Sequence, residues 1–147
     1  MNAEFLGPLQ VELVAPWEST GRGHWALLSP LQFYSERLDV VITVPAGFIT
    51  DFASVPKLPL AYGLFGGLYA SPAVVHDFLC REKVMPRQKA DRVFLEAMRA
   101  QNAAEIAWMT EQGIDDDEVI DRKAGLEGQS QVMYAAVYAY SALRRLA

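Results

Sequence analysis

Apolar and polar residues alternate along the first part of the chain. Leu9, Val11 and Leu13 are separated by single polar residues, which is the period of a strand with one buried face. Further short extended segments, the last of them rich in β-branched residues, follow at 24–28, 31–35 and 39–44. Proline and glycine at 45–47 then favour a turn. The pattern predicts a small, mostly antiparallel sheet over residues 1–50.

Helical patterning replaces this alternation after a loop-rich segment, 51–70, in which prolines and glycines interrupt regular structure. Ser71 followed by Pro72 favours a helix start, with Ser71 as the N-cap. The apolar positions that follow indicate a helix that continues to Cys80. In this helix the apolar face places His76 and Cys80 on one flank and Asp77 on the opposite side.

Two or three more helices are predicted beyond this point. One begins near Pro86 and ends at Gly113, a residue type typical of helix C-termini. Alternatively, Asn102 with Glu105 three residues later forms a capping box that starts a separate helix. The acidic run 115–118 suits a helix start, and Ser130 can cap a last helix that ends near Leu146.

The predicted fold is therefore α+β, with a small N-terminal sheet followed by three or four helices in a single domain over 1–147. Its 52% apolar and 21% charged residues exclude a disordered chain, a collagen and a coiled coil. The chain has one cysteine, Cys80, so no internal disulfide can form. The first residues lack the pattern of a signal peptide, and we expect a reducing cytoplasm.

Charge and hydropathy bear on the expected partners. The formal net charge is −5, and the basic residues of the segment 81–99 are interleaved with carboxylates, which argues against a nucleic-acid surface. The longest apolar run near the C-terminus, 132–143, is shorter than the roughly 20 residues that cross a bilayer. We expect no membrane span and interpret this run as a buried or interface helix.

Five polar residues are candidates for one cleft, provided that the loop after residue 50 folds back over the helix that follows. The chain has two histidines, and His24 lies in a predicted strand. Loops held by a rigid sheet are where functional groups concentrate. The five candidate residues are Asp51, Ser54, His76, Asp77 and Asp91.

Several chemistries could use such a cleft. Asp51, His76 and Asp91, with or without Asp77, form an oxygen-rich ligand set suited to a divalent metal such as Mg²⁺, Mn²⁺ or a catalytic Zn²⁺. In a metal-free alternative, Asp51 orients His76, which takes a proton from water or from Ser54. Asp51, Ser54, His76 and Asp77 are the catalytic candidates.

Two further interpretations concern the same residues. Cys80 lies four residues after His76 and is therefore its neighbour on the helix, where a thiol nucleophile is one alternative and a buried thiol the other. A purely structural interpretation has Asp51 capping a turn and His76 bonding a loop carbonyl, so that both secure the loop to the helix.

Three segments together resemble a phage and prophage family, the domain of unknown function 1353. They contain the patterns T-D-x-A-S-V-P, H-D and A-D-x-x-F, and lie at Phe48–Pro56, Ala73–Leu79 and Arg87–Met98. The resemblance covers about residues 5–100 and the final tyrosine-rich helix. It implies a bacteriophage context, but no activity that could be transferred. The stretch 102–128 is longer than the family pattern needs.

Two functions are consistent with these observations. The first is a virion or assembly accessory protein that acts through contacts with other phage proteins, located in the virion or the host cytoplasm. Its tyrosines and tryptophans suit such contacts, because aromatic residues are enriched at interfaces. The second is a small phage hydrolase, metal-assisted or acid–base and directed at the cell wall, that uses Asp51, His76, Asp77 and Asp91.

Overall fold

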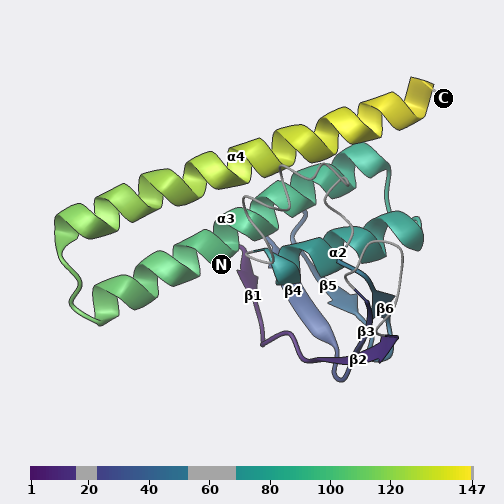
Figure 1. The fold of residues 1–147 in the computed structure, drawn as a ribbon, viewed down its shortest axis with the longest axis horizontal. Coiled ribbons are helices and arrows are strands. Elements are labelled where there is room, and N and C mark those ends of the chain that lie inside the picture. The colour runs from purple at the N-terminus through teal and green to yellow at the C-terminus, as the bar shows by residue number, and fades with distance from the viewer. Residues whose placement is uncertain (16–22, 53–68, 147) are drawn as a thin grey trace.

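The computed structural model describes residues 1–15, 23–52 and 69–146 (Figure 1). Six short strands precede three helices in this part of the chain, which confirms the α+β prediction. The strands are β1 (Glu4–Phe5), β2 (Val11–Ala15), β3 (His24–Leu27), β4 (Leu31–Ser35), β5 (Val40–Val44) and β6 (Ile49–Thr50).

The strands form two small antiparallel sheets rather than one. One sheet has the order β1-β4-β5, and the other has the order β2-β3-β6. The β3–β6 pair of one sheet and the β4–β5 pair of the other are parts of one bent two-stranded ribbon. Along this ribbon β3 is followed by β4 on one side, and β5 is followed by β6 on the other. Leu27 holds the corner, because its N–H donates to the carbonyl of Phe48 and its carbonyl accepts from the N–H of Gly47. Gly47 has φ +83°, as the predicted turn requires.

The helices are α2 (Ala70–Arg81), α3 (Arg87–Glu111) and α4 (Asp116–Leu146). The prediction of Ser71 as N-cap is wrong by two residues, since the N-cap of α2 is Tyr69. The turn after α3 follows the prediction: Gly113 has φ +73°, and the N–H of Ile114 closes the turn on the carbonyl of Met109.

Two predicted helix starts lie inside continuous helices. Asn102 is an interior residue of α3, where its side chain is buried against other groups instead of capping a new helix. Ser130 is an interior residue of α4, and its hydroxyl donates to the carbonyl of Glu127. A serine that back-bonds within a helix has the same sequence signature as a serine cap, so tertiary packing decides between them.

The apolar residues of the described chain gather into two clusters. In the larger, α2 and α3 cover the sheets; among its fully buried side chains are Leu31, Phe33, Val44, Val75, Leu79 and Val93. The smaller cluster attaches α4 to α2 and α3, and consists mainly of Tyr69, Ala73, Phe94, Met98, Met133 and Val137. We call the sheets, α2 and the overlying part of α3 up to Arg99 the body.

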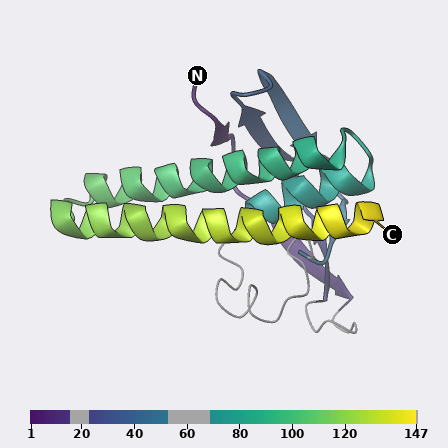
Figure 2. The same cartoon turned by 90° about the horizontal axis from the view of Figure 1, so that it is seen from above.

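The remaining parts of α3 and α4 extend beyond the body as a hairpin. Figure 2 shows the two helices side by side, with their connected ends projecting past the sheets. We call residues 100–127 the arm. Only Asn102, Met109 and Leu126 are buried in the arm, so little apolar surface holds its two helices together.

Candidate functional site

A buried pair of side chains links α2 to α3. Nε2 of His76 lies 2.7 Å from Oδ1 of Asp91, and the two residues are 1% and 0% exposed. The carboxylate that contacts His76 is thus Asp91 from the next helix. The ring of Phe94 lies 5.1 Å from the imidazole, and Sγ of Cys80 lies 3.6 Å from Nε2. The pair therefore has an apolar wall on one side and a thiol on another.

The imidazole of His76 is positively charged at neutral pH, with both ring nitrogens protonated. Burial lowers its pKa, but the hydrogen bonds to Asp91 and Cys80 and the charges of both groups raise it further than burial lowers it. The resulting pKa is about 9. His76 and Asp91 are accordingly a buried ion pair, in which Nε2–H donates to the carboxylate. The pair thus links α2 to α3 by a charged hydrogen bond.

Two atoms of this pair remain without a hydrogen-bond partner in the described part of the chain. They are Nδ1 of His76 and Oδ2 of Asp91, and both are buried. Buried polar atoms in native proteins nearly always have partners. Nδ1 of a protonated imidazole is a donor and Oδ2 is an acceptor, so each can bind one further group of opposite hydrogen-bonding type.

Asp77 belongs to a separate polar cluster that joins α2 to β6. Its carboxylate accepts a hydrogen bond from Thr50 Oγ1 at 3.1 Å and lies 3.4 Å from Nε of Arg81. The guanidinium of Arg81 also donates to the carbonyl of Ile49 and lies over the ring of Phe48. These contacts fasten the end of the ribbon to the helix.

The pKa of Asp77 depends on its burial and on its neighbours, among them the loop residue Asp51. Burial raises the pKa of Asp77, whereas the charge of Arg81 and the hydrogen bond from Thr50 lower it. The charge of Asp51 raises it again, and the net direction is upward. Asp51, half-buried after β6, is therefore within electrostatic range of Asp77. Ser54 lies outside the described residues.

A metal centre would need more ligands than the described residues provide. No group of three or more His, Cys, Asp or Glu side chains in residues 1–15, 23–52 and 69–146 could hold a metal ion. Two residues of the predicted ligand set, His76 and Asp91, are hydrogen-bonded to each other through Nε2 and Oδ1.

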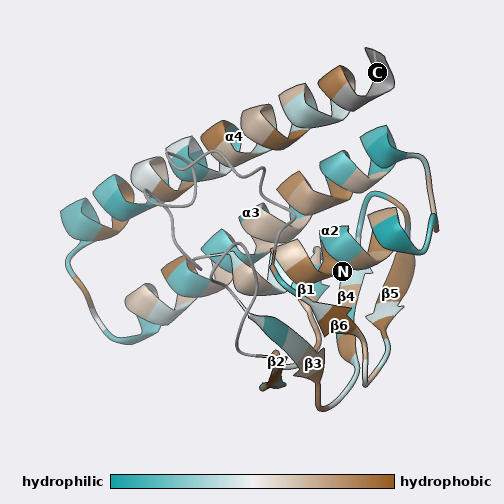
Figure 3. Ribbon diagram, turned by 45° about the vertical axis from the view of Figure 1, so that its right-hand side comes forward, coloured by the Kyte–Doolittle hydropathy of each residue, from teal (hydrophilic) through white to brown (hydrophobic). Residues whose placement is uncertain are grey.

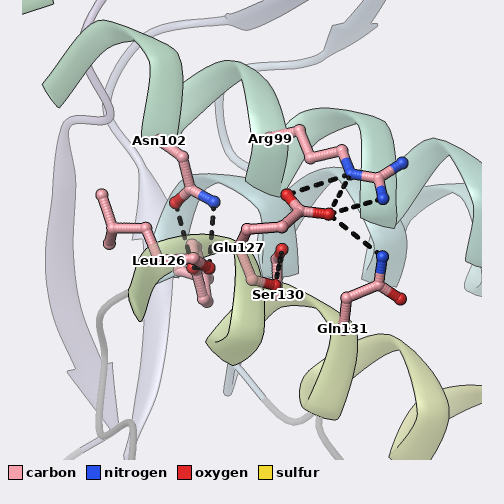
Figure 4. Close-up of polar contacts among 7 residues, drawn as sticks. Arg99, Asn102, Leu126, Glu127, Ser130 and Gln131 are labelled. Atoms are coloured by element: carbon pink, nitrogen blue, oxygen red, sulfur yellow. Dashed lines mark hydrogen bonds and ion pairs between the residues drawn. The ribbon is translucent and has the colours of Figure 1, made fainter. Parts of the chain in front are cut away.

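Sequence reasoning missed a second group of polar contacts, between α3 and α4. Arg99 binds the carboxylate of Glu127 with two nitrogens, at 2.7 and 3.1 Å, which lowers the pKa of Glu127 (Figure 4). Asn102 donates to the carbonyl of Leu126, and the hydroxyl of Tyr69 lies within hydrogen-bond distance of both groups. The sequence contains only a weak signal for these contacts, because the residues that bond each other are 24 to 57 positions apart in the chain.

The helix α4 buries Met133 and Val137 together with two serines, and it exposes other apolar residues. Ser130 and Ser141 are buried, and Nε of Arg87 on α3 donates to the hydroxyl of Ser141. Val132 and Leu143 are 51% and 65% exposed. Helical spacing puts Val132 and Leu143 on one face with Ala139 and Tyr140, which are exposed as well. We call these four residues the outer face of α4.

Comparison with known proteins identifies the family but no activity. The sequence model of the family DUF1353, described as a protein of unknown function, matches residues 25–110, more than half of the chain. The match spans the ribbon, α2 and most of α3, and ends before α4 begins. No curated protein and no solved structure matches the chain. None of the helices in the described residues is long and apolar enough to cross a membrane.

Proposed function

We propose that this chain, which belongs to the DUF1353 family of proteins of unknown function, is a bacteriophage accessory protein of the virion or of virion assembly. It acts by binding other phage proteins, in the virion or in the host cytoplasm, and not by catalysis. The phage context comes from the family resemblance of the three sequence segments. The binding role rests on the distribution of buried polar and exposed apolar side chains.

One observation carries the proposal: the outer face of α4 is mainly apolar and exposed, with Val132 and Leu143 the most exposed of its four residues. Val132 and Leu143 are more than half exposed, and Tyr140 is 40% exposed. Exposed apolar residues that share one face are typical of protein interaction sites, and tyrosine is enriched at interfaces. Met133 and Val137 pack α4 against α2 and α3, so the helix has no need of its outer apolar residues for its own packing.

The state of the histidine supports a structural role for the candidate site. His76 is buried, protonated and paired with Asp91. A general base must be deprotonated and must reach its substrate. The pair satisfies neither condition, and its two ends belong to the two helices that cover the sheets. We therefore assign it to holding the body in shape.

The proposal predicts that the chain is a component of virions or of assembly intermediates. Quantitative mass spectrometry of particles from the encoding phage should find it in a fixed copy number. The variant Val132→Asp/Leu143→Asp should fold but be lost from the particles, because two charges replace apolar contacts. Lys89→Asp, on an exposed position of α3, is the matched control and should be retained. Absence of the wild-type chain from both particles and intermediates would overturn the proposal.

A second candidate function is the cell-wall hydrolase. The observation that favours it is the pair of unpartnered atoms, Nδ1 of His76 and Oδ2 of Asp91, beside the thiol of Cys80. In this proposal a conformational change exposes the pair, and His76 exchanges protons with a peptide or glycan substrate. Purified protein should then release soluble fragments from peptidoglycan, and a folded Asp91→Asn variant should not. No release by the folded wild type would exclude it.

A further inference from the structure

The two sheets of the described chain have four edge strands, and three of these carry features that prevent pairing with another chain. β1 and β6 are two residues long. β2 has the exposed charge of Glu12, and its register shifts between Leu13 and Ala15. Short length, charge and irregularity are the usual protections of sheet edges.

The fourth edge, β5, lacks all of these protections. Its five residues are Val, Val, Ile, Thr and Val, all β-branched and uncharged. They pair with β4 in an uninterrupted register from Val40 to Val44. On the other side of β5 no strand is paired in the described residues. Figure 3 shows β5 at the side of the sheet and coloured largely as hydrophobic. Val40 and Val41 are each 46% exposed.

We propose that β5 is a self-association edge, which pairs antiparallel with β5 of a second copy about a two-fold axis at Ile42. In this register Ile42 of one copy faces Ile42 of the other. Val41 faces Thr43, and Val40 faces Val44. The two sheets then join into one continuous sheet of six strands. This proposal concerns a surface apart from the outer face of α4, and it does not rest on the proposed function.

The register follows from the faces of the strand. Ile42 and Val44 are buried toward α2, whereas Val41 and Thr43 are exposed on the opposite face. Directly opposite residues of an antiparallel pair lie on the same face, and a slip by one residue would exchange the faces. Pairing about Ile42 keeps the buried faces together. It also uses all five residues, which gives the largest number of hydrogen bonds.

The second copy is the occupant that this edge fits best, for two reasons. The strand is complementary to itself in both length and charge: Asp39, the nearest charged residue, would face Pro45 of the other copy and meet no like charge. The other edges of the described chain are too short or too irregular to pair over five residues. The contact is small, so we expect a dissociation constant of about 10–100 µM.

Sedimentation velocity with charge-swapped variants tests this pairing. Val41→Lys/Thr43→Lys and Val41→Glu/Thr43→Glu alter two exposed residues and should leave the body folded. In each homodimer the altered residues face each other with like charges, so each variant alone should be monomeric. Their equal mixture should dimerise at least as well as wild type, because every pair is then of opposite charge. Val14→Lys on β2, another position that is 46% exposed, is the control and should dimerise like wild type.

The outcomes separate this proposal from its alternatives. Dimerisation of the wild type, with loss in each variant and recovery in the mixture, supports it. The proposal is overturned if the wild type stays monomeric up to about 1 mM, a concentration well above the expected constant. It is equally overturned if the mixture stays monomeric, or if the lysine variant dimerises like wild type. Dimerisation that disappears in Val132→Asp/Leu143→Asp instead would assign the contact to α4.

Discussion

Where α3 passes over the sheets, its buried residues are mostly apolar, whereas in the arm it meets α4 mainly through hydrogen bonds and ion pairs. Among the described residues, the body holds the buried His76–Asp91 pair within its apolar core. The arm contains the Arg122–Glu105 ion pair, is joined to the body by the Arg99–Glu127 ion pair, and buries little apolar surface. Apolar burial dominates folding free energy, while exposed ion pairs contribute little. The body should therefore be the stable unit, and the arm a part that opens more easily.

The largest expected loss of unfolding free energy comes from a substitution in the body. Asp91→Ala leaves the protonated His76 buried without its partner and should lower the free energy of unfolding by about 3–5 kcal/mol. The double variant His76→Leu/Asp91→Leu removes both charges and should stay within about 2 kcal/mol of wild type. Urea denaturation measures both, with the exposed Asp121→Ala as control. A loss below about 1 kcal/mol in Asp91→Ala would mean that the pair does not hold the body together.

The pH dependence of stability sharpens the same contrast. The pKa of His76 is raised from 6.5 to about 9 by folding, so the folded state binds its proton more tightly. The resulting stabilisation is fully present below pH 6.5 and is lost as the pH rises through about 9. Its size is roughly 3 kcal/mol. Denaturation curves between pH 6 and 9.5 should show this loss in wild type and not in His76→Leu/Asp91→Leu. Equal curves for the two proteins would contradict it.

An intermediate loss of stability is expected from a substitution at the contact between body and arm. Asn102→Ala removes the amide that bonds Leu126 and Tyr69, and should cost about 1–2 kcal/mol. Hydrogen exchange should become faster in residues 100–127 and stay unchanged in β4 and α2, because the body does not depend on this contact. Uniform acceleration across both regions would show that arm and body unfold as one unit.

The smallest loss of stability is expected at the exposed ion pair between Arg99, the last residue of the body, and Glu127 of the arm. Arg99 and Glu127 are each 46% exposed at their side chains. Arg99→Gln and Glu127→Gln should each cost about 0.5 kcal/mol, and the coupling in a double-mutant cycle should shrink with added salt. Thermal denaturation at low and high salt measures this coupling. A salt-independent coupling above about 2 kcal/mol would place this pair in the same class as His76–Asp91.

Sequence patterns predicted the fold more fully than the site. Alternation and β-branching identified the antiparallel strands, and Gly113 identified a helix end, because these signals are local. The continuity of α4 through Ser130 was missed, since capping and back-bonding serines look alike in sequence. His76 and Asp91 were both candidates, but their direct contact depends on how two helices pack. The outer face of α4 and the edge of β5 depend on which surfaces remain uncovered, and that is a tertiary property.

Site-specific photo-crosslinking in infected cells tests the central claim most directly, namely that the outer face of α4 binds another phage protein. A photoreactive residue is placed at Val132 or Leu143, and at the exposed Lys89 of the body as control. The account predicts that Val132 and Leu143 crosslink to the same phage protein and that Lys89 does not. Crosslinking from neither outer-face position, or equal crosslinking from Lys89, would contradict it.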